Sequence, residues 1–121
     1  MSAFENLGRL APVPVWQAIA ARMVNGERLT LAVVELDPGA VIAEHAHPHE
    51  QLGIVIRGAM HFRVGDETRD LGPGETWTIP SNVPHEATAG PDGAVVIDVF
   101  APVREDWQPL AGDERAPRWP Q

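Results

Sequence analysis

Four side chains with the chemistry of metal ligands stand out in the sequence, namely His45, His47, Gln51 and His85. His45 and His47 are two residues apart, and residues at that spacing in an extended chain point to the same face. Gln51 has the same parity as both histidines, although Pro48 makes one unbroken strand through all three unfavourable. His85 would have to reach them from a separate strand.

This set of donors predicts a site for a divalent transition metal. Neutral imidazole nitrogens and one oxygen donor suit zinc, nickel, iron or manganese, and the ligand types alone do not choose among these metals. The competing interpretation is that the histidines are exposed residues in polar turns. For a single histidine, we would prefer that interpretation. We favour the metal because the donors come as a spaced set.

The composition indicates one ordinary globular domain. The chain has 121 residues, 44% of them hydrophobic and 21% charged, which is enough for one sizeable core but not for two. No apolar run approaches the ~20 residues that span a membrane, and the first residues lack the pattern of a secretory signal. We therefore expect no membrane association and, by default, a cytoplasmic protein.

Charge and residue usage exclude several classes of function. The net charge of −8 argues against nucleic acid as a partner, because phosphate binding needs a cationic face. The chain has no cysteine, which excludes disulfides and thiolate ligands, and no tyrosine, which excludes a phenol as acid or nucleophile. All nine basic residues are arginine, so a Schiff base on a lysine side chain is excluded as well.

Frequent glycine and proline residues divide the chain into short segments that are typical of β-strands. We predict strands over residues 28–36, 52–56, 60–64, 68–71, 76–79 and 94–100. Such a series is typical of an antiparallel sandwich or barrel. Residues 15–23 fit a helix and an N-terminal strand equally well. The tail, residues 106–121, is predicted to be irregular and to pack on the barrel or on a partner subunit.

The first ligand segment resembles the first of the two paired motifs of the cupin superfamily. Gly39, His45, His47 and Gly58 fall in register with that motif. Gln51 stands at the position where the family pattern has a glutamate.

The second ligand segment resembles the second cupin motif, with Gly74, Pro80 and His85 in register. It departs from the pattern at two positions, because Asn82 replaces a glycine and Ala89 stands where an asparagine is expected. Matches in both motifs together are far more specific than an isolated His-x-His.

The resemblance implies an all-β fold, the double-stranded β-helix of cupins, which is a small jelly-roll-like barrel. It implies a single domain over residues 1–121 with a barrel core at about 28–104. Residues 1–27 and 105–121 would be extensions that contact the barrel or a second subunit. Cupins of this kind dimerise through the N-terminal segment, so we expect a homodimer.

The glutamine at the glutamate position changes the expected chemistry of the metal. Three imidazoles and an amide are all neutral, so both charges of a divalent ion would remain at the site. A more positive centre is a stronger Lewis acid and attracts anions more strongly, and it is less suited to iron redox cycling. The alternative is that Gln51 marks a decayed, metal-free site, but every other ligand position is intact.

Within the cupins, the ligand segments resemble the group of the pectin-degradation protein KdgF, which also has a three-His, one-Gln site. The further functional residues of that group have counterparts at matching offsets in Asp98, Phe100 and Arg104. The resemblance covers about half the chain, from Gly39 to Arg104. It implies conversion of ring-form 4,5-unsaturated uronates from pectin or alginate into linear 5-keto-4-deoxyuronate.

The three further residues suit this chemistry by their types. Asp98 could move protons as a general acid or base, and it shares one strand face with Phe100, which would form a flat wall for the sugar. Arg104 offers a forked donor for a carboxylate. Each has an ordinary alternative: a strand aspartate with a local partner, a core phenylalanine and a solvated surface arginine.

Two other classes of function stay open on the sequence. One keeps the metal and changes the reaction to a dioxygenase or another isomerase or lyase, and the other is a non-catalytic module that binds a small anion. Two further histidines are left outside the ligand set: we favour a surface position for His49 and a structural role for His61.

Overall fold

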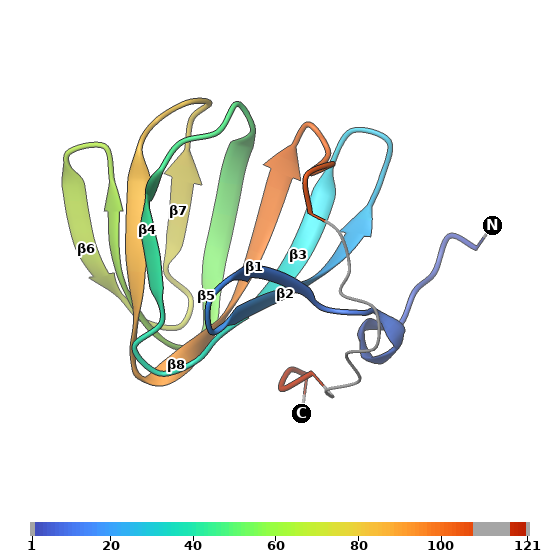
Figure 1. Cartoon of the computed structure of the whole chain (residues 1–121), viewed down its shortest axis with the longest axis horizontal. Helices are drawn as coiled ribbons and strands as arrows, with labels where there is room; N and C mark the ends of the chain where they lie inside the picture. Colours follow the sequence, from blue (N-terminus) through green and yellow to red (C-terminus); the bar gives the residue numbers. More distant parts are fainter. Residues whose placement is uncertain (1, 108–116, 121) are drawn as a thin grey trace.

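The computed structural model describes residues 2–107 and 117–120 and contains almost only β-structure (Figure 1). Within these residues a 3-10 turn, η1, spans Leu7–Arg9. The strands are β1 (Val13–Trp16), β2 (Ile19–Asn25), β3 (Thr30–Leu36), β4 (Val41–His45), β5 (Glu50–Val64), β6 (Glu67–Leu71), β7 (Thr76–Ile79) and β8 (His85–Ala101). The predicted all-β class is confirmed. In the part of the chain that the structure describes, no helix is long and apolar enough to cross a membrane.

Two long strands, β5 and β8, form the spine of the sheet. They pair antiparallel from Glu50 opposite Ala101 to Val64 opposite His85. The sheet order is β1-β2-β3-β8-β5-β6, with β4 added to the first part of β8 and β7 added to the first part of β5. Each long strand therefore serves two groups of neighbours, which curves the sheet around one interior (Figure 1).

Several predicted strands differ from the observed ones. Residues 15–23 form parts of β1 and β2 with a turn at Ala18, so the helical alternative is wrong. The predicted strands 52–56 and 60–64 are one strand, β5, in which the register shifts around Gly58. Gly58 has a φ of +82°, and a Cβ there would lie 2.1 Å from the carbonyl oxygen of Gly93, so only glycine fits.

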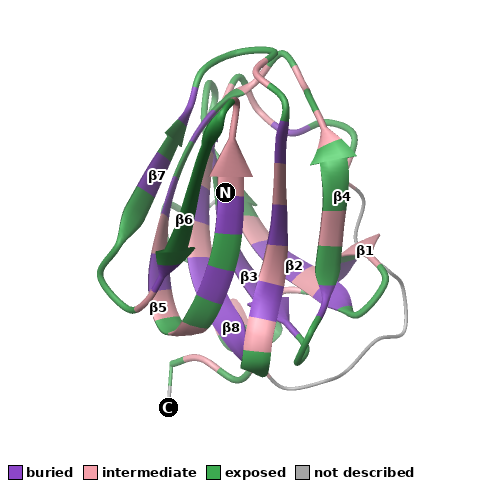
Figure 2. Cartoon of the chain, turned by 90° about the vertical axis from the view of Figure 1, so that its left-hand side faces the viewer, coloured by how far each residue is buried: buried purple, intermediate pink, exposed green. Residues whose placement is uncertain are grey.

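Burial alternates along the strands, as Figure 2 shows, because successive side chains point into and out of the barrel. The interior is filled largely by aliphatic and aromatic side chains, among them Leu36, Val55, Met60, Ile79 and Phe100. Seven polar or charged residues are buried in the described part of the chain, and three of them are Gln51, His85 and Asp98. Burial of polar groups is unfavourable unless they find partners, so these residues mark the place to look for function.

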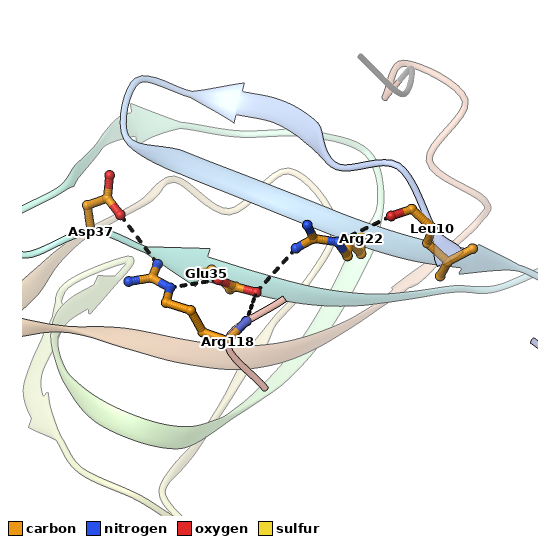
Figure 3. Close-up of polar contacts among 5 residues, drawn as sticks. All are labelled: Leu10, Arg22, Glu35, Asp37 and Arg118. Atoms are coloured by element: carbon orange, nitrogen blue, oxygen red, sulfur yellow. Dashed lines mark hydrogen bonds and ion pairs between the residues drawn. The ribbon is translucent and has the colours of Figure 1, made fainter. Parts of the chain in front are cut away.

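The C-terminal residues 117–120 lie against the outside of β3 (Figure 3). Glu35 is buried and accepts hydrogen bonds from the backbone N–H and the Nε of Arg118, at 2.9 and 2.7 Å, and from Arg22 at 3.2 Å. Arg118 also reaches Asp37 at 3.3 Å. This part of the tail has no helix or strand and packs on the barrel, as predicted, while residues 108–116 lie outside the described part.

Candidate metal centre and the cavity around it

The three histidines singled out from the sequence lie together inside one end of the barrel. His45 ends β4 and is the register partner of His85, the first residue of β8, while His47 follows in the turn between β4 and β5. Their ring centroids are 4.2 to 5.6 Å apart. One ring nitrogen from each lies within 4.8 Å of the others, which is the grouping a metal ion needs.

All three rings are oriented by the backbone. The Nδ1 atoms of His45, His47 and His85 donate to the carbonyl oxygens of residues 43, 49 and 83, at 2.9, 3.0 and 2.9 Å. A carbonyl can only accept, so each neutral ring carries its proton on Nδ1 and its lone pair on Nε2. Such bonds to the second ring nitrogen are typical of metal-ligating histidines. Among the described residues, the buried Nε2 of His85 has no hydrogen-bond partner.

Gln51 completes the group with an oxygen. Its Oε1 lies 3.1 Å from Nε2 of His47, while its Nε2 donates to Oδ1 of Asp98 at 2.9 Å. The bond to Asp98 fixes which end of the amide faces the histidines. Two acceptors, the amide oxygen and the His47 lone pair, therefore face each other, and a cation would satisfy both. The residues present fit a divalent metal.

Ionisation of the site follows its burial. Burial, the charge of Arg104 and the neighbouring His85 lower the pKa of His47 to about 4, so this ring is neutral at pH 7. Burial also lowers the pKa of His85. Burial raises the pKa of Asp98 to about 6, against the opposing effects of the hydrogen bonds from Gln51 and Trp77 and the charge of Arg104.

Trp77 and Gly53 position Asp98 from across the sheet. Gly53 is the register partner of both Trp77 and Asp98. A Cβ on Gly53 would lie 2.1 Å from the Trp77 ring, so the missing side chain makes room for the indole. The indole Nε1 thereby donates to Oδ1 of Asp98 at 2.9 Å. Gly53 could not be identified from the sequence, because a glycine in a strand carries no signal of which side chain lies over it.

The histidines open into a cavity of about 310 Å³ within the barrel. Asp98, Phe100 and Arg104, which the sequence analysis singled out, line the same cavity. Its wall also includes Trp16, whose ring centroid lies 5.2 Å from that of His45. A volume of this size suits one small organic ligand.

Arg104 is buried, not solvated. Its guanidinium carbon lies 4.7 Å from the ring centre of Phe100 and 4.1 Å from that of Trp107. Its Nε and Nη2 donate to the two carboxylate oxygens of Asp106, at 3.0 and 2.9 Å. Asp106 and Trp107 also line the cavity. Trp107 was open from the sequence between a sugar site and core packing, whereas Asp106 gave no signal, because a tail aspartate is common on surfaces.

The remaining singled-out residues fall in different places. His61 is exposed on β5, where its Nδ1 lies 2.6 Å from Oδ1 of Asp70, and it does not line the cavity. His49 is half-buried instead of exposed, with its ring against those of His47 and Phe100. Asn82, which replaces a motif glycine, has a φ of +64°, a conformation that asparagine tolerates better than most residues.

Comparison with known proteins decides the family. Residues 32–100 match the family described as Cupin domain. The chain belongs to the cupin family. As a cupin, it carries its three clustered histidines in a fold that related proteins share.

Individual relatives are similar over most of the barrel. The pectin degradation protein KdgF of Dickeya dadantii (strain 3937) is 30% identical over 80 residues, which cover 65% of this chain and 73% of that protein. The structure of KdgF from Halomonas sp. aligns with a TM-score of 0.80 at 30% identity, covering 88% of this chain and 98% of that one. An RmlC-like cupin from Shewanella frigidimarina NCIMB 400 aligns with a TM-score of 0.81 at 28% identity, covering 88% and 96%.

A second curated relative is much longer than this chain. Oxalate decarboxylase OxdC of Bacillus subtilis (strain 168) is 32% identical over 79 residues, which are 61% of this chain but only 20% of that protein. The relatives therefore include a pectin degradation protein and an oxalate decarboxylase, so membership of the family does not by itself fix the reaction.

Proposed function

We propose that this cupin is a metal-dependent isomerase that converts 4,5-unsaturated uronates from pectin or alginate breakdown into linear 5-keto-4-deoxyuronate. The observation that carries the proposal is the joint presence of a cationic Arg104 and a buried Asp98 in the cavity of the three histidines. The similarity to the two KdgF proteins supports the same substrate class.

His45, His47, His85 and Gln51 would hold the divalent metal. When bound, the ion would supply Lewis-acid polarisation of a substrate oxygen. Three imidazoles that ligate through a lone pair and one amide carry no charge, so the ion would keep both of its charges. That favours an anionic substrate and a reaction without redox change.

The reaction is balanced as an isomerisation. The bond between the anomeric carbon and the ring oxygen breaks, which leaves an aldehyde and an enol, and the enol becomes a ketone when the carbon at position 4 takes a proton. The net change moves one proton from the anomeric hydroxyl to that carbon. No oxidant, reductant or further reactant is needed.

The chain's own residues take three roles in this proposal. Asp98 is the proton-transferring group, because its carboxylate lines the cavity and one of its oxygens is held by Gln51 and Trp77. Phe100 forms an apolar wall beside the histidines, with its ring centroid 5.9 Å from that of His47. Arg104 binds the substrate carboxylate.

The expected assembly is a homodimer. On the outer face of the sheet, four apolar residues form a cross-strand row with the register Val24–Leu31–Val99–Leu52. Three of them, all except Val99, are exposed. An apolar row of this kind suits burial against a second copy. Light scattering on the purified protein should give a dimer mass, and Leu31→Glu should reduce it to that of a monomer.

The test of the activity follows the substrate's conjugated double bond. Metal-loaded protein should remove its ultraviolet absorbance faster than the spontaneous decay. Asp98→Asn keeps an acceptor oxygen for Trp77 and should lose the acceleration at unchanged metal content. Arg104→Gln should raise KM with metal retained. If the absorbance disappears no faster with metal-loaded protein than without protein, the proposal is refuted. If either variant loses its metal, the replaced residue acts on the metal site.

A further inference from the structure

Asp106 takes one of the two edges by which Arg104 can bind a carboxylate. A guanidinium offers a side edge, Nε with Nη2, and an end edge, Nη1 with Nη2, and each can make two parallel hydrogen bonds. Asp106 occupies the side edge at 3.0 and 2.9 Å. Among the described residues, no side chain other than Asp106 accepts a hydrogen bond from this guanidinium.

Arg104 is fixed by contacts other than Asp106. Phe100 and Trp107 both contact the guanidinium. Its backbone N–H donates to Oγ1 of the fully buried Thr30 at 2.9 Å. Removal of the Asp106 charge would therefore leave the guanidinium in place and change mainly its electrostatic environment.

The Asp106 carboxylate also faces any ligand that enters the cavity. Arg104 uses two of the acceptor positions of this carboxylate. Because the side chain lines the cavity and is 57% exposed, the other acceptor positions stay available to ligand donors. The hydrogen bond and charge of Arg104 hold the pKa of Asp106 below its usual value, so the group stays negative at neutral pH. A negative group here repels each ligand carboxylate and accepts hydrogen bonds from ligand hydroxyls.

We propose that Asp106 sets the charge selectivity of the cavity. It restricts Arg104 to one ligand carboxylate on the end edge and favours hydroxylated monocarboxylates over dicarboxylates. The inference rests on the proposed function in treating the cavity as a carboxylate site. It goes beyond that function in assigning a specificity residue from the C-terminal segment, outside the matched residues 32–100.

The test compares two probes that have the same six-carbon hydroxylated chain, D-gluconate with one carboxylate and D-glucarate with two. Calorimetry on zinc-loaded protein measures their affinities for the wild type, Asp106→Asn and Glu105→Gln. Glu105→Gln removes the same charge one residue away, from a side chain that does not line the cavity. Half-exposed charge pairs of this kind change affinity by roughly threefold per carboxylate.

The wild type should bind gluconate better than glucarate. Asp106→Asn should bind gluconate about threefold and glucarate about tenfold more tightly than the wild type, at unchanged zinc content. Glu105→Gln should shift neither by more than about twofold. Equal gains for both probes, weaker binding of either, or the same gains in Glu105→Gln would overturn the proposal. Absence of binding to all three proteins would overturn it too, because it requires a carboxylate site.

The two proposals fail separately. If the wild type does not accelerate uronate decay but Asp106→Asn shifts the probe ratio, only the proposed reaction is wrong. If uronate is turned over and the probe ratio is unchanged by Asp106→Asn, only the role of Asp106 is wrong.

Discussion

Replacing Gln51 by glutamate tests the arrangement on which the site depends. The amide of Gln51 donates from Nε2 to Asp98 and turns Oε1 to His47. In Gln51→Glu, a second carboxylate oxygen would face Oδ1 of Asp98 at the present 2.9 Å contact. Two buried carboxylates at this distance cannot both ionise without a large electrostatic cost. One of them must keep a proton, or the contact must break.

The magnitude follows from the lost contact. A buried hydrogen bond to a charged group contributes roughly 1.5 to 3 kcal/mol, so the metal-free variant should lose about 2 to 3 kcal/mol of unfolding free energy at pH 8. At pH 5 the two carboxyls share a proton, which restores a hydrogen bond and removes most of the loss.

The direction of the pH effect is fixed by proton binding. The folded variant keeps the shared proton to a pH above the ordinary range of Glu and Asp, so it binds more protons than the unfolded chain. The free energy of unfolding of Gln51→Glu is therefore close to that of the wild type near pH 5, and it falls below the wild-type value as the pH rises toward 8. A metal ion at the site should reduce the loss, because it offsets the added negative charge.

Urea unfolding of chelator-treated and metal-loaded protein at pH 5 and pH 8 measures these differences. Gln17→Glu is the matched control, because the same substitution is made on an exposed turn. If Gln51→Glu and Gln17→Glu show the same pH dependence in the metal-free state, the amide of Gln51 does not donate to Asp98, and the assigned orientation of the amide is refuted.

Two further predictions concern metal binding and packing. His85→Ala should lower the metal affinity at least about 100-fold, measured in competition with a fluorescent chelator. His61→Ala, on the exposed part of β5, should keep the wild-type affinity, and equal losses in the two variants would argue against His85 as a metal ligand. Gly53→Ala should lower the free energy of unfolding in urea by about 1 to 3 kcal/mol, because its Cβ would overlap the Trp77 ring. Gly26→Ala is the control, since a Cβ there meets nothing closer than 3.6 Å, and equal costs in the two variants would argue against the packing at Gly53.

The sequence predicted the position of the histidines well because local spacing and glycine-rich turns carry that information. His45 and His47 follow the period of an extended chain, and the cupin motifs give the register of His85. Asp98 and Arg104 were found only through resemblance, since an isolated aspartate or arginine in a strand or loop is ambiguous. Their place in one cavity needed the folded chain.

The length of β8 shows where local signals fail. The segment from Gly90 to Gly93 has the residues of a turn, and the predicted strand began only at residue 94. The observed strand starts at His85 and continues through this segment, because β4 and β5 pair with its first part and β3 and β5 with its second. The turn residues remain as an irregularity inside the longer strand: residues 90–93 of β8 stand opposite Ala59 of β5, and Gly93 has a φ of +75°.

Glutamine at the glutamate position has a second consequence, which the sequence alone does not show. From the sequence it changed only the charge at the metal. In the folded chain the same amide must also donate to Asp98, which lies 47 positions away. Of glutamate and glutamine, only glutamine can offer an acceptor to the metal side and a donor to the buried carboxylate without taking up a proton, so Gln51 and Asp98 are matched to each other. A decayed site has no reason to preserve that match, and the pair therefore argues that the departure from the family pattern is functional.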